Sequence, residues 1–145
     1  MTVIFSKKCE YGLQAVLYLA AKQKEDVITA EEIAKKLSIP KEFVSKILQN
    51  LTESGMVNSK KGKSGGFFLA KDQKLIRLID IVTAIDGLEI FNSCVLGFPN
   101  CSPEHPCPLH DKWGTLRTNA YNMLTDQTLD QLRDKTLNKI NHLDD

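Results

Sequence analysis

The chain has 145 residues, of which 42% are hydrophobic, enough for one domain with a core or for a small domain with an appendage. Its formal net charge is only +1, so a polyanionic partner would have to be recognised by a local concentration of charge. The longest apolar run, residues 15–21, is too short to span a bilayer, and the N-terminus lacks the apolar core of a signal peptide. We therefore expect a cytoplasmic protein with no membrane partner.

Two helices are predicted before the first proline. Residues 7–23 are apolar almost all round, which predicts a buried helix. After a polar turn at residues 24–27, Thr29 and Glu32 have the spacing of a capping box, in which two side chains cap the first turn of a helix. This second helix is short because Pro40 cannot continue it.

A third helix is predicted from about residue 41 to Ser54, with Gly55 just past its end. An apolar set should face the core and a polar set should face outward. The apolar arc consists of Phe43, Val44, Ile47, Leu48 and Leu51, and the polar side consists of Lys41, Glu42, Ser45, Lys46 and Gln49. A short helix, a tight turn and such an amphipathic helix form the helix-turn-helix pattern, whose second helix enters the DNA major groove. An ordinary pair of solvated helices has the same pattern, so the next segment is needed to decide.

A β-hairpin with a basic, glycine-rich tip is predicted next, because strand-like residues 56–59 and 67–70 flank residues 60–66. Beside a helix-turn-helix, such a hairpin is typical of a DNA-binding wing, whose glycines let the backbone approach phosphates and whose lysines displace counterions. Residues 29–70 carry seven lysines and four acids, a local net charge of +3. A nucleotide-binding P-loop is rejected because that motif needs glycine where Val57 stands. The tip residues expected to contact DNA are Lys60, Lys61, Lys63 and Ser64.

Further helices are predicted on both sides of a cysteine-rich loop. Residues 75–86 should form a helix that ends at Gly87, with an apolar side made of Leu75, Leu78, Ile79, Val82 and Ile85. After the loop, two more apolar stripes recur at helical spacing: Trp113, Leu116, Ala120, Met123 and Leu124, then Leu129, Leu132, Leu137, Ile140 and Leu143. These stripes exceed what the end of a small domain needs. A homodimer that reads two DNA half-sites is therefore preferred to packing within one chain.

The cysteine-rich loop, residues 94–110, contains three of the four cysteines and two of the three histidines. Its prolines fix φ and remove backbone donors, which predicts an extended loop that can wrap around a metal or cluster. Cys107 should be the residue before the following helix, and Pro108 the first helical residue. The positive end of that helix should then lower the pKa of the Cys107 thiol and favour metal binding.

Several kinds of site fit this loop. In a reducing compartment its cysteines should be free thiols or metal ligands rather than a disulfide. Cys94, Cys101, Cys107 and His110 have the ligand types of a Cys3His zinc site, although an RNA-binding finger is disfavoured by the scarcity of basic and aromatic side chains. A cysteine enzyme that uses Cys107 with His110 is disfavoured further, because no third orienting group or pocket can be named. Structural zinc and an iron–sulfur cluster remain open.

Four segments together resemble the Rrf2 family of bacterial transcription regulators over essentially the whole chain. They are the opening SKKCEYGLQAVLYLA, the run IAKKLSIPKEFVSKILQNLTESGMV, the wing KKGKSGGFFLA and the loop end PCPLHDKW. The resemblance implies a mainly α fold with a small β-hairpin, namely a winged helix-turn-helix. It further implies a homodimer that binds double-stranded DNA and is joined through a C-terminal dimerisation helix after the loop. It also implies an iron–sulfur cluster, of the 2Fe–2S or 4Fe–4S type, held by Cys94, Cys101 and Cys107. The chain departs from the family pattern at Lys61, where many members have arginine, and in the first cysteine gap, which is six residues rather than five.

Three residues are candidates for the fourth cluster ligand. His110 matches the histidine of the iron–sulfur biogenesis regulators in the family. Glu10 matches the acidic residue that, in nitric oxide-sensing relatives, reaches the cluster from the other subunit. Cys9 is a third candidate, although a cysteine on an apolar helix more often belongs to the core.

The expected organisation is a DNA-binding domain at residues 1–88, a cluster-binding loop at residues 89–110, and a dimerisation helix with a C-terminal segment at residues 111–145. The expected function is that of a non-enzymatic transcription regulator, a repressor or dual regulator, that senses redox, nitric oxide or iron–sulfur status. The alternative is a winged-helix protein with structural zinc and no sensing role.

Overall fold

The computed structural model describes residues 4–22 and 26–143. In this part of the chain, helices dominate and one antiparallel hairpin is the only sheet, which confirms the mainly α class. None of the described helices combines the length and apolarity of a bilayer-spanning segment. The elements are α1 (Lys7–Ala21), α2 (Ala30–Leu37), α3 (Lys41–Glu53), β1 (Val57–Lys60), β2 (Gly66–Leu69), η1 (Gln73–Leu75), α4 (Leu78–Ile85), η2 (Glu89–Phe91), α5 (His110–Thr125) and α6 (Leu129–Asn141).

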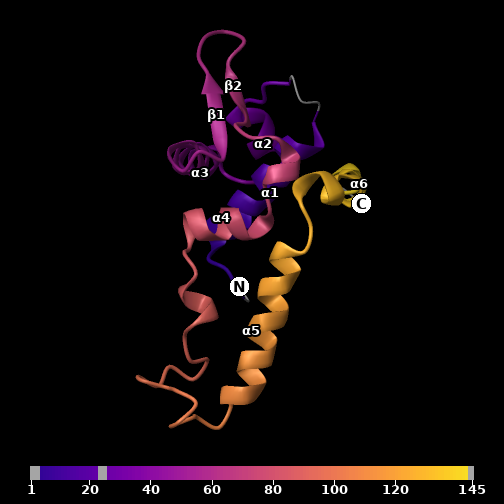
Figure 1. Ribbon diagram of the computed structural model, residues 1–145. Coiled ribbons are helices and arrows are strands. Elements are labelled where there is room, and N and C mark those ends of the chain that lie inside the picture. Colours follow the sequence, from indigo (N-terminus) through magenta and orange to yellow (C-terminus); the bar gives the residue numbers. More distant parts are fainter. Residues whose placement is uncertain (1–3, 23–25, 144–145) are drawn as a thin grey trace.

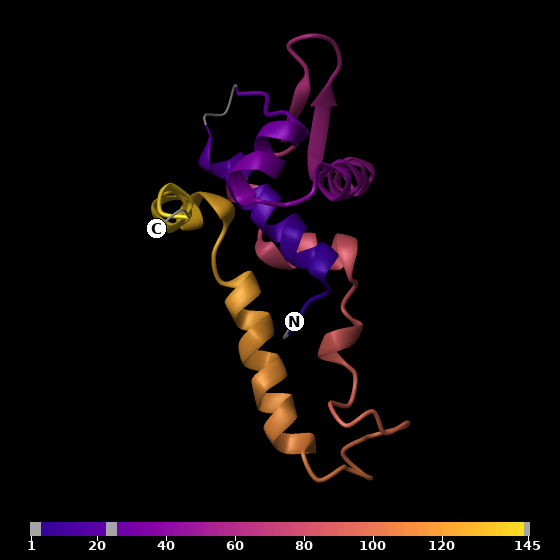
Figure 2. The ribbon, with the colours of Figure 1, turned by 180° about the vertical axis from the view of Figure 1, so that it is seen from behind.

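The molecule has a head and an arm. The head contains α1 to α4, the hairpin and α6, whereas α5 runs away from it, and the cysteine-rich loop lies at the end farthest from the hairpin (Figure 1). The view from behind shows the same separation (Figure 2). The loop therefore lies far from the basic tip of the hairpin, and any communication between them has to pass through α4, α5 and the segments that join them.

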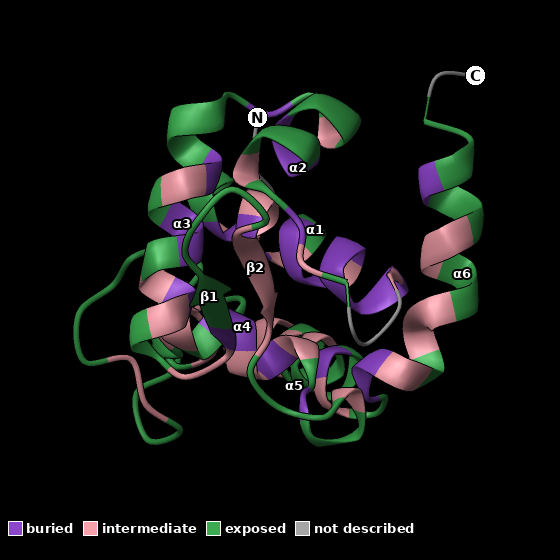
Figure 3. Cartoon of the chain, turned by 90° about the horizontal axis from the view of Figure 1, so that it is seen from above, coloured by how far each residue is buried: buried purple, intermediate pink, exposed green. Residues whose placement is uncertain are grey.

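Helix α1 forms the centre of the head. Ser6 caps it by accepting a hydrogen bond from the Cys9 backbone N–H, and most of its residues are buried, as predicted. It lies between α3 and α6, and its buried residues appear in purple in the view from above (Figure 3). Residue 23, the predicted helix end, and part of the predicted turn at 24–27 lie outside the described residues. On α6, Leu129 and Ile140 are buried in the same core, so this C-terminal stripe packs back on its own chain.

The helix-turn-helix consists of α2 and α3. The Thr29 hydroxyl caps α2 as predicted, accepting from the Glu32 N–H at 3.0 Å, while the Glu32 carboxylate accepts from the Tyr18 hydroxyl at 2.8 Å. Ser38 has a left-handed conformation (φ 55°) that ends α2 and starts the turn. The predicted core arc is wrong at Phe43, which is 52% exposed and contacts only the edge of the core through an edge-on packing of its ring against Tyr11.

The hairpin pairs Val57 with Leu69 and Lys60 with Gly66, close to the predicted strands. A third segment joins it: Ile28 and Phe67 exchange backbone hydrogen bonds of 2.9 and 2.7 Å, which fastens the hairpin to the start of α2. This bridge was not predicted, because one strand-like residue gives no periodic signal. At Gly66, a Cβ atom would lie only 2.6 Å from the Ile28 carbonyl oxygen, so the close approach of the two segments requires glycine.

Replacing Gly66 with alanine should lower the free energy of unfolding by about 1–3 kcal/mol, because the clash is with backbone that cannot rotate away. Urea denaturation would measure this loss. The matched control is Gly114→Ala on α5, where the nearest atom to an added Cβ is Arg117 Nη2 at 3.7 Å. The control should be neutral or should stabilise by up to about 1 kcal/mol, since alanine is the better helix former. Equal losses in both variants would contradict this explanation.

Helix α4 begins later than predicted. Leu75 lies in η1 and is 66% exposed, while Ile76 is extended and its carbonyl oxygen accepts from the Leu129 N–H at 2.9 Å. Since Ile76 pairs with the start of α6, the helix can start only at Leu78. The same junction is held by the Arg77 Nε–H, which donates to the Thr125 carbonyl at 2.9 Å. The head end of α5 is thus tied to the segment that leads into α4.

Candidate metal centre and nucleic-acid interface

The three cysteines of the loop converge as predicted. The Sγ atoms of Cys94, Cys101 and Cys107 all lie within 4.8 Å of one another. The Cys94 and Cys107 sulfurs are 3.5 Å apart, and His110 Nδ1 lies 3.3 Å from the Cys101 sulfur. All four residues are half-buried. Three thiols and one imidazole therefore meet at the end of α5.

Two side chains of α5 fasten the segment that leads into the loop. The Trp113 Nε1–H donates to the Ser93 carbonyl at 2.8 Å, and Arg117 Nη1 donates to the Phe91 carbonyl at 2.8 Å. The Phe91 ring also packs edge-on against Tyr121, with ring centroids 5.5 Å apart. Trp113 is half-buried and its indole N–H is used toward the loop, so its place in a dimerisation stripe stays a prediction. Sequence reasoning also missed Arg117, because a donor to a distant carbonyl leaves no local pattern.

The predicted helix start at Pro108 is also wrong. Helix α5 begins at His110, and Cys107 lies in the preceding turn, where its carbonyl accepts from the His110 N–H at 3.1 Å. Enclosure and the neighbouring thiols raise the pKa of Cys107, the reverse of the prediction. Enclosure also raises the pKa of Cys94, but the backbone N–H groups of Phe98 and Leu96 outweigh it and bring this pKa down to about 7. The pKa values of these two neighbouring thiols are therefore shifted in opposite directions.

The donor set fits either of two metal groups. Thiolate and imidazole ligands suit both zinc and iron–sulfur clusters. A tetrahedral zinc ion with Zn–S distances of about 2.3 Å places its sulfur ligands about 3.8 Å apart, close to the spacing of the three thiols. A cluster distributes its ligands over more than one iron, so it requires the thiols to move apart. The proline-rich loop has no regular structure between η2 and α5 to prevent this.

The candidates for the fourth ligand lie in different places. His110 is beside the thiols, as described above. Glu10 is on α1 and pairs with Lys7 at 3.5 Å, in the head rather than at the loop (Figure 1). Cys9 is fully buried against Ile79, Val82 and Leu124, so it is a core residue in this structure. Burial, with the nearby Asp86 carboxylate, raises the Cys9 pKa to about 12.

The residues predicted to contact DNA lie on α3 and on the hairpin, and all but one of them are exposed. On α3, Ser45 is half-buried and the other four predicted residues are exposed: Lys41, Glu42, Lys46 and Gln49. On the hairpin, Lys60, Lys61, Lys63 and Ser64 are all exposed. The hairpin projects beside α3 (Figure 1), as a wing beside a reading helix must.

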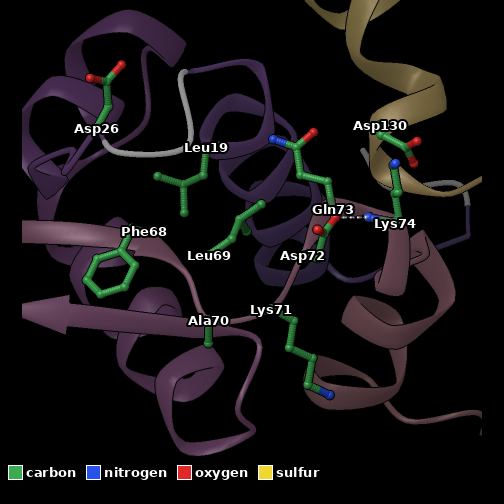
Figure 4. A pocket seen from close by; sticks show the side chains of 10 residues that line it. All are labelled: Leu19, Asp26, Phe68, Leu69, Ala70, Lys71, Asp72, Gln73, Lys74 and Asp130. Carbon is green, nitrogen blue, oxygen red and sulfur yellow. Dashed lines mark hydrogen bonds between the residues drawn. The ribbon is translucent and has the colours of Figure 1, made fainter.

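A pocket of about 560 Å³ lies between the hairpin and α6 (Figure 4). Its polar lining is partly engaged within the chain: the Gln73 amide donates to the Ala20 carbonyl at 2.8 Å, and the Lys74 N–H donates to Asp72 at 2.9 Å. Its charged side chains have both signs, including Lys71, Lys74 and Asp130. It is separate from the cysteine site and from the exposed side of α3.

A helix-turn-helix with a basic wing defines a DNA-binding transcriptional regulator, and comparison with known proteins agrees. Residues 5–135 match the Rrf2 family, described as iron-dependent transcriptional regulators, and the chain belongs to this family. It is 34% identical over 132 residues to a protein of Aquifex aeolicus named as an HTH-type transcriptional regulator, covering 90% of this chain and 91% of that one. A Mycobacterium tuberculosis protein named in the same way is 32% identical over 126 residues, covering 86% and 77%. The prediction of a non-enzymatic regulator is thus confirmed.

Solved structures confirm the winged-helix fold. CymR of B. subtilis, described as its global cysteine regulator, superposes with a TM-score of 0.77 at 24% identity, covering 92% of this chain and 98% of that one. IscR of T. potens superposes with a TM-score of 0.70 at 24% identity, covering 93% and 88%. At this level of identity the likeness concerns the fold alone.

Proposed function

We propose that this regulator binds double-stranded DNA as a homodimer and senses redox, nitric oxide or iron–sulfur status through a cluster held by Cys94, Cys101 and Cys107. The observation that carries the proposal is the convergence of three thiols within 4.8 Å at the end of α5, remote from the DNA-facing side. In this proposal, residues 1–88 read DNA, residues 89–110 bind the cluster, and residues 111–145 supply the dimerisation helix and the segment that returns to the head. The regulator would act as a repressor or dual regulator.

The route from the loop to the reading helix runs through bonded contacts. A bound iron–sulfur cluster would supply one-electron redox chemistry and irons that react with oxygen or nitric oxide. While a bound cluster joins the three thiols, the end of the loop is fixed. When the cluster is lost, the thiols are free to separate. Their movement would reach Phe91 and Gly87, then Asp86, whose carboxylate accepts from the Ser6 N–H at 2.9 Å. Ser6 caps α1, which packs against α3.

Dimerisation through α5 is supported by an apolar stripe that this chain leaves uncovered. Leu116 is 60% exposed and Met123 is 62% exposed, with Ala120 between them on the same side of the helix. Residues with such spacing commonly lie at a helix–helix interface. A symmetric pair of α5 helices would hold two reading helices for two half-sites.

A visible absorption spectrum of protein purified without oxygen tests the cluster. Iron–sulfur proteins are brown, so we expect visible absorbance in the purified protein and in protein reconstituted with iron and sulfide. This absorbance should disappear on oxidation or on nitric oxide treatment. Colourless protein that contains zinc, and that takes up no cluster under these conditions, would refute the sensing function.

Structural zinc is the second candidate, and the thiol spacing specifically favours it. The present separations need little change to surround one tetrahedral ion. In that case the loop would stabilise the arm, and the regulator would respond to something other than a cluster. Metal analysis of the same purified sample distinguishes the two candidates.

The wing and the reading helix should differ in how their variants bind DNA. Lys61→Ala or Lys63→Ala should weaken binding to all sequences alike and reduce the salt dependence of affinity by roughly one counterion each. Ser45→Ala or Gln49→Ala should instead change which bases are preferred. Lys112→Ala, an exposed lysine near the loop end of α5, is the control and should leave binding unchanged. Fluorescence anisotropy over a range of salt concentrations would reveal a misassignment if the wing variants altered base preference at an unchanged salt slope.

A further inference from the structure

Arg117 extends from α5 to the wall of the cysteine site. A small cavity of about 40 Å³ is lined by all three loop cysteines and His110, and Arg117 lines it with them. Its remaining lining is Asn92, Ser93 and Trp113, so Arg117 is the only permanently charged side chain on the described wall. Its Nη1 donates to the Phe91 carbonyl, which fixes the guanidinium in this position.

The Nε of Arg117 is buried and has no hydrogen-bond partner. A buried N–H of a charged group without an acceptor is costly, and native structures rarely retain one without a reason. A bound metal holds all three cysteines as thiolates, which brings three negative charges and several sulfur acceptors to the same cavity. Arg117 therefore borders the cavity in which a metal-bound state would place acceptors.

We propose that Arg117 is a positioning residue of the metal centre, and that its guanidinium offsets the negative charge of the three thiolates once they hold metal. The inference rests on the proposed function only in taking Cys94, Cys101 and Cys107 as metal ligands. Two consequences follow from the sign of the charge. Arg117 strengthens metal uptake by the thiols, and it favours the reduced, more negative form of a cluster, since net charge and hydrogen bonds near the sulfurs set its potential.

Titration of the reduced, metal-free protein with Co²⁺ alone tests the first consequence, because cobalt–thiolate bonds have their own absorption. Arg117→Gln removes the charge and should weaken Co²⁺ binding by about tenfold or more, the size expected for a hydrogen bond to a charged group. Arg117→Lys keeps the charge and should retain most of the wild-type affinity. A lysine variant as weak as the glutamine variant would overturn the charge argument.

Two matched controls separate charge from packing. Arg133 on α6 also has a buried, unpartnered Nε, but its Nη2 donates to the Ala21 carbonyl, and the side chain lies in the head. Arg133→Gln should therefore leave Co²⁺ affinity unchanged. Trp113→Phe removes the neighbouring hydrogen bond to Ser93 without a change of charge, and it should weaken Co²⁺ binding less than Arg117→Gln does. If Arg117→Gln does not fold by circular dichroism, the comparison of Arg117→Lys with wild type and Trp113→Phe decides.

The midpoint potential of the reconstituted cluster tests the second consequence. It should move to a more negative value in Arg117→Gln and stay near the wild-type value in Arg117→Lys and Arg133→Gln. Equal Co²⁺ affinities and equal potentials in wild type and Arg117→Gln would refute the role of Arg117 while leaving the cluster proposal intact. A wild type that takes up no cluster, but whose Co²⁺ affinity falls in Arg117→Gln, would refute the sensing function while supporting the role of Arg117.

Discussion

Replacing any one of Cys94, Cys101 and Cys107 with alanine is expected to abolish nearly all of the visible absorption of the reconstituted protein. Each thiolate is a strong anionic donor, and the described loop holds no spare thiol that could take its place. The remaining two thiols would bind iron or zinc weakly, and the metal would be lost on gel filtration. Absorption spectra with iron and sulfide analysis measure the outcome.

Cys9→Ala is the matched control for these variants. It also removes one thiol, but a fully buried one in the head, so the spectrum should be unchanged while the free energy of unfolding falls by roughly 1 kcal/mol for the lost packing. If all three loop variants retained a full cluster, the loop would not be the metal site. If Cys9→Ala alone lost its colour, the cluster would lie in the head.

The fourth ligand should be revealed by a milder change. Water or a solvent thiol can replace a lost histidine or carboxylate, so the cluster should persist with an altered spectrum and faster oxidative loss. We expect His110→Ala to have this effect if all ligands come from one chain, because His110 Nδ1 already lies 3.3 Å from the Cys101 sulfur. A spectral change in Glu10→Ala with none in His110→Ala would instead indicate that the partner subunit's Glu10 completes the site.

Leu116→Asp is expected to convert the dimer to monomers. A charge in the middle of the uncovered apolar stripe of α5 cannot be buried between two helices without a partner. A monomer binds one half-site at a time, so affinity for a two-half-site operator should fall by roughly 100-fold or more through lost avidity. Sedimentation equilibrium and operator binding measure the two effects.

Thr118→Asp supplies the control for the dimer. It places the same charge on α5 at another exposed position, about 200° around the helix from Leu116 by the helical repeat. This variant should remain dimeric and bind the operator normally. A dimeric Leu116→Asp protein would move the interface away from this stripe, and monomers in both variants would mean that charge anywhere on α5 disturbs the arm.

Local signals in the sequence predicted most of the head. Thr29 caps α2, Gly55 follows α3, and the glycines around residue 65 turn the hairpin, because each of these roles depends on neighbours within a few residues. The grouping of the cysteines was also predictable, since a short proline-rich loop can bring them together. Their roles as ligands remain predictions.

The errors arose where distant segments compete for the same backbone groups. Leu75 was expected in a helix, but the neighbouring Ile76 pairs with Leu129, more than fifty residues away. Leu124 was expected in the dimer stripe, but it is buried in its own chain with Cys9. Phe43 has the spacing of a core residue, yet it lies at the edge of the head against Tyr11. Helical spacing places a residue on a face of its helix and does not show how far the neighbouring element extends over that face.

Because α5 is held at both ends, by Trp113 and Arg117 at the loop and by Arg77 at the head, it should behave as a rigid lever. Its 16 residues span about 24 Å at 1.5 Å per residue. A tilt of about 8° over that length moves the far end by about 3.4 Å, the rise of one base pair along a DNA strand. We therefore expect a small change at the thiols to alter the preferred spacing of two half-sites. The metal-loaded and metal-free proteins should then rank operators with one base pair inserted or deleted between the half-sites in opposite orders of affinity. If both forms rank these operators in the same order, the arm transmits no tilt.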